Sequence, residues 1–276
     1  MVQEIKCFFE EHKNNRSYIW KLAVSKAKEE TINTTLGIYW DVIRDLVFFV
    51  AYGLFMFVMR GSHSQIDGMP MLVYLFTGLV AWYMIRDDLN IGVNCMVKNK
   101  NIFTKIKFPI MVIPTIETIA LYIKRVITVI LLALVLGVLM IVTGWRANVN
   151  ILGLIYSIGA SLLFGIAYSL FMSGFYTISK DFRELYKAIV RIQFYFVPIF
   201  WSVDHDLAKL GLSPGWIEFI KNLPFIHLID SFRMSIASGA FPPKHSVLIF
   251  FAFVLVLFLA GCYIQYRLRR IYADFI

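Results

Sequence analysis

One uncharged stretch decides the fold class: Val126-Ile-Thr-Val-Ile-Leu-Leu-Ala-Leu-Val-Leu-Gly-Val-Leu-Met-Ile-Val-Thr143. A helix needs about 20 residues to cross a hydrocarbon core of about 30 Å, so this stretch predicts a membrane span. The whole chain agrees, because 59% of its 276 residues are hydrophobic and only 16% are charged. This composition excludes a soluble globular protein and predicts an all-α membrane protein.

Working outward from this stretch, we find six apolar runs that predict transmembrane helices. We expect the spans at residues 38–59, 71–91, 109–143, 151–178, 188–203 and 246–266. The third begins just after Phe108-Pro109, because proline is tolerated in the first helical turn. The fifth is interrupted by Arg191 and Pro198.

Positive residues predict the orientation of these spans. The segments that this arrangement places inside carry 16 Lys and Arg residues, and those placed outside carry six. Because Lys and Arg are enriched on the cytoplasmic side, we expect both termini in the cytoplasm and the protein in the plasma membrane. Residues 1–35 then form a cytoplasmic N-terminus, 36–266 the transmembrane domain and 267–276 a cytoplasmic tail.

Two segments outside the spans are amphipathic. In the N-terminal segment, one helical face gathers Ile19, Leu22, Ala23 and Ala27. This pattern predicts an interfacial helix lying on the inner membrane surface, with an ordinary packing stripe as the alternative. Residues 204–240 carry two apolar patches on either side of Pro224, which predict two short re-entrant helices packed against protein.

The sequence lacks the common motifs for nucleotide or metal chemistry. It has no Gly-x-x-x-x-Gly-Lys-Ser/Thr loop and no His-Glu-x-x-His, and its five histidines and three cysteines lack metal-ligand spacing. We therefore expect no catalytic residue, metal or cofactor on this chain. The net charge of +9 is interpreted as a topology signal and not as a nucleic-acid site. Asp87-Asp88, beside Arg86, is interpreted as an ion cluster that snorkels to the headgroups.

Four further charges fall inside the predicted spans: Glu117, Lys124, Arg125 and Arg191. Each costs at least about 2.5 kcal/mol if it faces lipid, so each predicts either a ligand site or an ion pair. Glu117 and Lys124 are two turns apart on one face, and Glu117 is expected to pair with Lys124 or Arg191 if its role is structural. The three cations would attract a phosphate-bearing ligand.

The fourth predicted span has a small residue at every fourth position: Gly153, Ser157, Ser161, Gly165, Ser169 and Ser173. Small residues on one face let two helices approach closely in lipid, where association depends on van der Waals packing. The pattern predicts a tight helix contact along this seam.

Several short motifs, taken in order, resemble one family. They are Ile19-Trp20-Lys21-Leu22, Thr35-Leu-Gly-Ile-Tyr-Trp40, Lys105-Ile-Lys-Phe-Pro109, Asp181-Phe-Arg183, Arg191-Ile-Gln-Phe-Tyr-Phe-Val-Pro-Ile-Phe-Trp201 and Asn222-Leu-Pro-Phe-Ile-His-Leu-Ile-Asp-Ser-Phe-Arg233. Together they resemble the membrane subunits of ATP-binding-cassette exporters for cell-surface polysaccharides, the ABC-2 class. The permeases of wall teichoic acid export resemble this chain most.

The resemblance implies a homodimer of six-span subunits joined to two separate ATPase chains, which would hold ATP and Mg. It implies export of a lipid-linked glycan, wall teichoic acid above all, to the outer face of the membrane. O-antigen, capsule, drug or lipid export within the same class, and a membrane-embedded transferase from another class, are the alternatives. The resemblance also places an ATPase-docking segment at Lys98, Lys100, Ile102, Phe103, Lys105, Ile106 and Phe108.

Aromatic side chains on the first and fifth predicted spans would suit such a substrate, because rings stack on sugar faces and tolerate lipid. With the three cations named above, the substrate-path candidates are Tyr39, Trp40, Phe48, Tyr52, Phe194, Tyr195, Phe196, Phe200 and Trp201. Ordinary core packing is the alternative for each ring.

Overall fold

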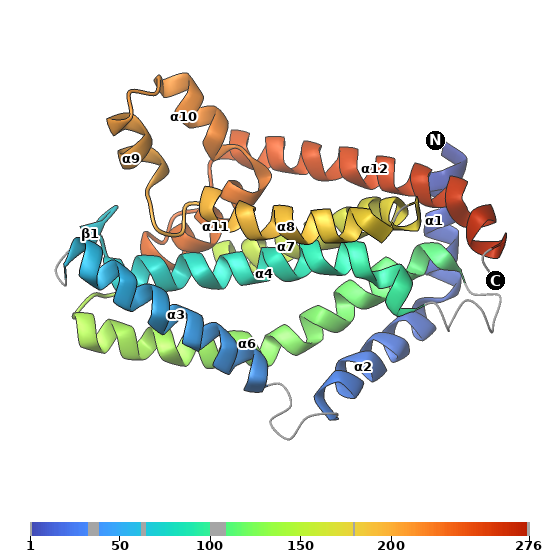
Figure 1. The fold of residues 1–276 in the computed structure, drawn as a ribbon, viewed down its shortest axis with the longest axis horizontal. Helices are drawn as coiled ribbons and strands as arrows, with labels where there is room; N and C mark the ends of the chain where they lie inside the picture. Colours follow the sequence, from blue (N-terminus) through green and yellow to red (C-terminus); the bar gives the residue numbers. More distant parts are fainter. Residues whose placement is uncertain (1, 33–38, 62–64, 100–108, 179, 275–276) are drawn as a thin grey trace.

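Long helices run side by side along the main axis of the molecule (Figure 1). A computed structural model describes residues 2–32, 39–61, 65–99, 109–178 and 180–274. Its helices are α1 (Val2–Asn14), α2 (Arg16–Ile32), α3 (Tyr39–Arg60), α4 (Met71–Lys98), α6 (Ile113–Thr143), α7 (Ile151–Ile178), α8 (Lys180–Phe196), α9 (Val203–Lys209), α10 (Pro214–Lys221), α11 (Pro224–Ala237) and α12 (Lys244–Asp274). A short 3-10 turn, η1 (Ile110–Val112), leads into α6.

Four of the described helices are long and apolar enough to cross a bilayer. The qualifying stretches are Val42–Met59, Ile110–Thr143, Ile151–Phe175 and Lys244–Leu268. The prediction of a helical membrane protein is therefore confirmed, whereas two of the six expected spans do not meet this criterion. In α4 the reason is the cluster of charges at residues 86–88, and α8 has only 17 residues.

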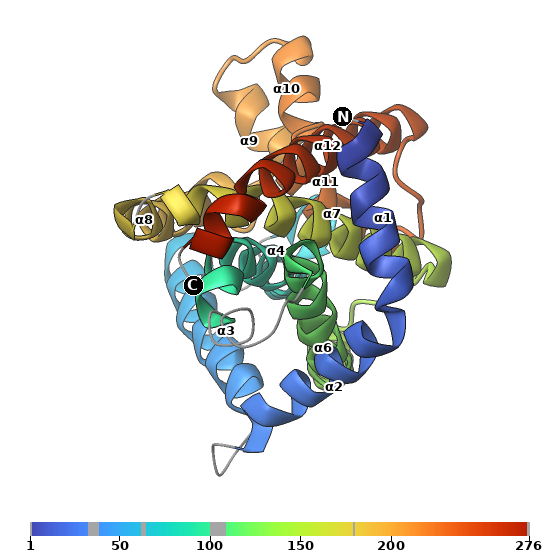
Figure 2. The same ribbon diagram turned by 90° about the vertical axis from the view of Figure 1, so that its right-hand side faces the viewer.

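Helix α4 lies in the middle of the bundle, as the view from the end that carries the termini shows (Figure 2). It contacts α3, α6, α7, α8 and α11, and most of its residues between Met71 and Met96 are buried. The helix continues to Lys98, beyond the predicted end of the second span at residue 91. Because protein surrounds α4, its polar and charged side chains need not face lipid.

The small residues of the fourth predicted span lie on α7 and are all buried. A Cβ built on Gly165 would lie 2.8 Å from Asp88 Oδ1 on α4, and Ser169 Oγ lies 3.3 Å from Thr118 Oγ1 on α6. At the end of the seam, Ser173 contacts the Gln265 side chain of α12. The seam therefore serves several helices, and its small side chains permit close approach to each of them.

The N-terminal segment forms two helices, and its apolar face does not lie open to lipid. In α2, Ile19, Ala23 and Ala27 are buried against Ile116 and Ala120 of α6, together with Val112 of η1. The alternative of an ordinary packing stripe is therefore confirmed for these three residues, whereas the position of the helix on the inner membrane surface stays a prediction. The bundle covers the face because α2 crosses the N-terminal half of α6, while Tyr18 and Trp20 stay exposed.

The fifth predicted span has different bounds in the structure. Helix α8 begins at Lys180 and ends at Phe196, and residues 197–202 form a buried, non-helical turn instead of completing a helix to 203. Pro198 accounts for this end, because it cannot supply the backbone donor that a continuing helix needs. Helix α8 also includes the polar residues before position 188, which the prediction left out. Among its charged side chains, Glu184, Lys187 and Arg191 lie on half-buried or exposed faces.

The structure contains a two-stranded hairpin, which the all-α prediction did not include. Strands β1 (Gln65–Ile66) and β2 (Met69–Pro70) pair antiparallel just before α4. Asp67 and Gly68 form the turn with φ of 49° and 75°, the left-handed values that a type I′ turn requires. The hairpin lies at the end of the molecule opposite both termini, near α9 (Figure 1).

Three helices, and not two, occupy the segment predicted to be re-entrant. Helix α11 carries the second apolar patch and packs against α4, α7 and α12. The first patch lies on α10, where no residue is buried and Trp216 and Phe219 are exposed. The prediction was that both patches pack against protein, on the bundle or at a dimer seam, and α11 does pack on the bundle. Helix α10 projects with α9 and leaves its patch exposed, so its place at a dimer seam stays a prediction (Figure 1).

The crossing of α7 and α12 gives a first prediction. A Cβ on Gly261 would lie 2.8 Å from the backbone nitrogen of Phe171, whereas one on Gly159 of α7 would meet nothing within 4 Å. We expect Gly261→Ala to destabilise the protein by about 1–3 kcal/mol, the usual cost of overpacking, and to lower its unfolding temperature in detergent. Gly159→Ala should raise that temperature or leave it unchanged, because alanine favours helix. Equal effects of both variants would contradict the close contact.

The orientation gives a second prediction. Lys209 on α9 and Lys98 at the end of α4 are both exposed, and the positive-inside pattern places them on opposite sides of the membrane. In a variant whose three native cysteines are replaced, a cysteine at position 209 should react with an impermeant thiol reagent applied to intact cells. A cysteine at position 98 should react only after the membrane is permeabilised. The reverse pattern would invert the topology.

Candidate functional site

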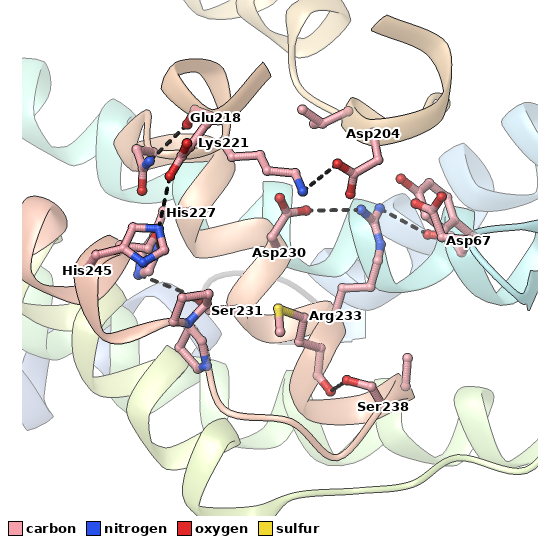
Figure 3. Close-up of a pocket in the computed structure, with 18 of the residues that line it drawn as sticks. Asp67, Asp204, Glu218, Lys221, His227, Asp230, Ser231, Arg233, Ser238 and His245 are labelled. Atoms are coloured by element: carbon pink, nitrogen blue, oxygen red, sulfur yellow. Dashed lines mark hydrogen bonds and ion pairs between the residues drawn. The ribbon is translucent and has the colours of Figure 1, made fainter. Parts of the chain in front are cut away.

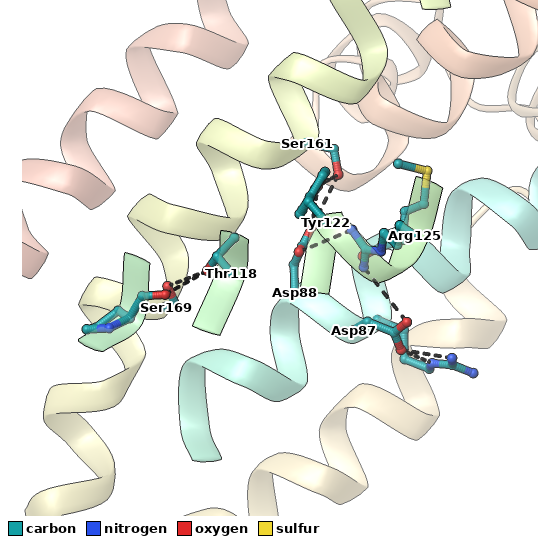
Figure 4. Close-up of polar contacts among 10 residues, drawn as sticks. Asp87, Asp88, Thr118, Tyr122, Arg125, Ser161 and Ser169 are labelled. Atoms are coloured by element: carbon teal, nitrogen blue, oxygen red, sulfur yellow. Dashed lines mark hydrogen bonds and ion pairs between the residues drawn. The ribbon is translucent and has the colours of Figure 1, made fainter. Parts of the chain in front are cut away.

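A buried ion pair at the centre of the bundle connects α4 and α6, and its hydrogen bonds reach α7 (Figure 4). Arg125 of α6 donates from Nη1 to Asp88 Oδ1 of α4 at 3.3 Å, and Arg125 also donates to the carbonyl oxygen of Met84. Asp88 Oδ2 accepts hydrogen bonds from Tyr122 at 3.1 Å and from Ser161 of α7 at 3.2 Å. The Asp88 side chain has no exposed surface. It is therefore not the snorkelling group predicted from sequence.

The neighbouring charges extend this network toward α3. Arg86 donates from Nε to Asp87 Oδ1 at 2.9 Å, and its Nη2 lies 3.8 Å from Asp45 Oδ1. Asp87 Oδ2 also lies 3.8 Å from Arg125 Nη2. Arg125, a predicted substrate contact, is thus held by carboxylates, and its first role is to compensate buried charge.

Glu117 has different partners from those expected. Its carboxylate binds the ammonium group of Lys26 on α2, accepts from Asn99 Nδ2 at 2.8 Å and lies 3.7 Å from Lys98 Nζ. The predicted pairing with Lys124 or Arg191 is wrong, because Lys26 approaches from another helix and fills the buried site. Asn99 caps α4, so this cluster joins the ends of α2, α4 and α6.

This cluster borders the predicted ATPase-docking segment. Of that segment's seven candidates, only Lys98 belongs to the described residues, and its side chain is half exposed. The other six fall at positions 100–108, outside the described residues. Nearby, His12 of α1 accepts or donates at 2.9 Å with Thr115 Oγ1, and burial lowers the pKa of this histidine below its ordinary value. A neutral His12 can therefore fasten α1 to the start of α6.

An aromatic cavity of about 490 Å³ lies between α3, α4 and α8. Five substrate-path candidates line it: Phe48, Tyr52, Arg191, Phe194 and Tyr195. The rings contact one another, with centroids 5.3 Å apart for Tyr52 and Phe194. None of the residues that line the cavity is a carboxylate, and Arg191 is exposed with no ion-pair partner among the described residues. The cavity thus combines ring faces with positive charge.

Sequence reasoning missed the other six residues of this wall: Trp82, Tyr83, Arg86, Asn90, Lys187 and Val190. Trp82, Arg86 and Asn90 recur at intervals of four on α4 and so share one face of the helix. The sequence shows this spacing, but it does not show that α8 is the helix that faces these residues. Along α8, Lys187 and Arg191 precede Phe194 and Tyr195, and along α4 Arg86 follows Trp82 and Tyr83.

The remaining candidates lie elsewhere. Tyr39, Trp40 and Phe196 are exposed on the bundle surface, and Phe200 packs against Tyr52 with ring centroids 5.0 Å apart. Trp201 is half-buried, and its backbone carbonyl accepts a hydrogen bond from Tyr74 at 2.9 Å. Lys124 and Arg125 line a separate cavity between α3, α4 and α6.

A third cavity, of about 390 Å³, lies at the end of the molecule opposite the termini (Figure 3). It is bounded by the hairpin turn, by α9, α10 and α11, and by the start of α12. Two ion pairs line it, Lys221 with Asp204 at 2.5 Å and Arg233 with Asp230 at 3.5 Å, and His245 Nε2 lies 3.7 Å from Glu218 Oε1. The first pair joins α10 to α9, the second lies within α11, and the contact of His245 with Glu218 connects α10 to α12. Within the described part of the chain, no group of three His, Cys, Asp or Glu residues is arranged to hold a metal ion.

The helices and buried ion pairs define the class, an α-helical membrane protein with polar cavities between its helices. No family model matches the sequence. The chain is similar to the O-antigen export system permease protein RfbA of Klebsiella pneumoniae, with 24% identity over 275 residues. The similarity covers 95% of this chain and 97% of that protein, so the two are distant homologues along their whole length.

The central ion pair gives a third prediction. Asp88→Asn should destabilise the protein by about 3–5 kcal/mol, because it leaves Arg125 buried without its main counter-charge. The double variant Asp88→Asn/Arg125→Met should recover much of this loss, since neither charge remains. Unfolding in detergent measures both effects. Glu184→Gln, which removes an exposed pair with Lys187, serves as the control and should change stability by less than about 1 kcal/mol. A similarly small effect of Asp88→Asn would contradict the role of the pair.

Proposed function

We propose that this chain is the membrane subunit of an ATP-driven exporter that moves a lipid-linked cell-surface glycan across the plasma membrane. The observation that carries the proposal is the aromatic cavity, in which six rings and three cations meet without a carboxylate. The full-length similarity to an export permease for O-antigen supports it. So does the resemblance of the sequence motifs to ABC-2 permeases.

The cavity suits both parts of such a substrate. Sugar rings present apolar faces that stack on Tyr52, Trp82 and Phe194, and such contacts do not require one particular sugar. Phosphates that join a glycan to its lipid carrier would accept charge-assisted hydrogen bonds from Arg191. The nearby carboxylates of Asp87 and Glu184 do not line the cavity and are paired with Arg86 and Lys187, which leaves Arg191 as the cation for these phosphates. Its position between α3 and α8 would let the lipid portion remain in the bilayer.

The motor would be a separate chain. The sequence has no phosphate-binding loop for ATP, so we infer that two ATPase subunits bind to a dimer of this protein and hold ATP and Mg. The cluster of Lys26, Lys98, Asn99 and Glu117 would then support the docking segment at residues 100–108, because it fixes the point at which α4 ends. In this arrangement each subunit has six membrane helices, of which α4 is shielded by its neighbours.

Two classes of glycan are candidate substrates. The motif resemblance favours wall teichoic acid, a polymer with phosphate in every repeat, whereas the homologue exports O-antigen. The aromatic cavity accepts either, because it recognises the linkage to lipid and the sugar faces near it. Purified complex should therefore show ATP hydrolysis that a lipid-linked glycan stimulates. Comparing phosphate-rich with phosphate-free repeats, both on the same lipid, would assign the substrate.

The aromatic cavity gives a fourth prediction. Arg191→Gln should lower export by about tenfold to a hundredfold, since hydrogen bonds to charged groups contribute about 1.5–3 kcal/mol. Phe194→Ala should also lower export, whereas Phe196→Ala on the same helix should not, because Phe196 does not line the cavity. Export of surface glycan in cells and glycan-stimulated ATP hydrolysis measure these effects.

The controls separate this function from its alternatives. Basal ATP hydrolysis and co-purification of the ATPase should be the same in the Arg191 and Phe194 variants as in the parent protein. Full export by both variants would place the substrate path elsewhere. Stimulation by simple amphiphiles, but not by lipid-linked glycans, would point to a drug or lipid exporter of the same fold.

A further inference from the structure

A second cavity, of about 430 Å³, lies on the other side of α3 from the aromatic cavity. It is bounded by α3, α4 and α6, and we call it the cationic cavity. The side chains of Arg44, Arg86, Lys124 and Arg125 line it, opposed by the carboxylates of Asp45 and Asp87. Its wall thus carries more positive than negative charge.

The four cations are not equivalent. Arg86 and Arg125 contact the carboxylates of Asp45, Asp87 and Asp88, and their side chains are only 24% and 9% exposed, so little of either is open to a ligand. Arg44 is exposed near the start of α3, and Lys124 is half-buried on α6. These two residues stand at the edge of the cavity on facing helices, where a ligand entering from the membrane would meet them first.

The cavity changes character along the bundle. Its polar residues lie toward the end of the molecule that holds the termini, which the positive-inside pattern places in the cytoplasm. Farther from the termini, the wall includes Val80 of α4 and Val129 and Leu132 of α6. The transition from charged to apolar wall within one cavity matches the shape of a lipid, with a polar headgroup and an acyl chain.

We propose that the cationic cavity binds an anionic phospholipid of the inner leaflet. Arg44 and Lys124 hold its phosphate, and one acyl chain lies along Val129 and Leu132. Basic pockets between membrane helices on the cytoplasmic side favour anionic headgroups, and four of the residues that line this cavity are cations. The proposal concerns a site different from the aromatic cavity, although Tyr83, Arg86 and Asn90 line both.

The test measures lipid binding to the purified full-length protein in a neutral detergent by native mass spectrometry. We expect phosphatidylglycerol to bind more tightly than phosphatidylcholine. The double variant Arg44→Gln/Lys124→Gln should weaken phosphatidylglycerol binding by about thirtyfold, the loss expected for two basic residues near a lipid headgroup. The control Arg146→Gln/Lys209→Gln removes two exposed charges outside the cavity and should leave binding unchanged.

A second variant tests the acyl-chain contact without changing charge. Val129→Phe fills the apolar part of the cavity and should also weaken phosphatidylglycerol binding, while the charge-preserving Arg44→Lys should keep most of it. The unfolding temperature of each variant shows whether it is folded. Equal binding of phosphatidylglycerol to the parent protein, the double glutamine variant and Val129→Phe would overturn the proposal.

Two further probes distinguish the sources of phosphate. Inorganic phosphate or pyrophosphate, at concentrations that saturate a soluble anion site, should not displace phosphatidylglycerol; displacement would show a site for a free anion. Farnesyl diphosphate, a short lipid diphosphate, should compete no better than phosphatidylglycerol. Stronger competition that depends on Arg44 and Lys124 would assign the cavity to an exported lipid carrier and overturn the resident phospholipid. Neither result depends on export through the aromatic cavity.

Discussion

The arrangement of the bundle depends on the pairing of Arg125 with Asp88. A guanidinium group and a carboxylate on neighbouring helices are costly in lipid unless they meet, and here they meet at the centre of α4, α6 and α7. The small residues of α7 make this possible, because Ser161 donates to Asp88 and Gly165 leaves room beside it. The ion pair and the small-residue seam are thus one structural feature, and both fix α4 in the middle.

The position of α4 then determines where ligands can bind. Tyr83, Arg86 and Asn90 lie within two turns of Asp88, and they line cavities on both sides of α3. Asp87 and Asp45 compensate Arg86, so its charge does not require a ligand. Arg191 on α8 has no such partner among the described residues. The helix that carries the buried charge network therefore also supplies the shared wall of two binding sites.

Local patterns in the sequence predicted the membrane class, most helix bounds and the small-residue seam, because periodicity and length are properties of one segment. They failed where a distant segment competes for a partner. Glu117 was matched with Lys124 on its own helix, but Lys26 reaches it across the α2–α6 contact. The apolar face of α2 was likewise assigned to lipid because nothing within α2 reveals that α6 covers it. The Asp67-Gly68 turn, by contrast, was a readable hairpin signal that was overlooked.

The aromatic residues predicted to line the substrate path lie in different environments in the structure. Phe194, Tyr195 and Phe196 are consecutive, yet only the first two line the aromatic cavity, because successive residues on a helix point about 100° apart. Sequence alone could not choose among them, because it does not show that α8 ends at Phe196 or that the helices facing it across the cavity are α3 and α4. Once α4 is fixed by the central ion pair, the choice follows. Rings that face Trp82 and Tyr52 enclose the aromatic cavity, whereas the ring of Phe196 lies outside it and is exposed.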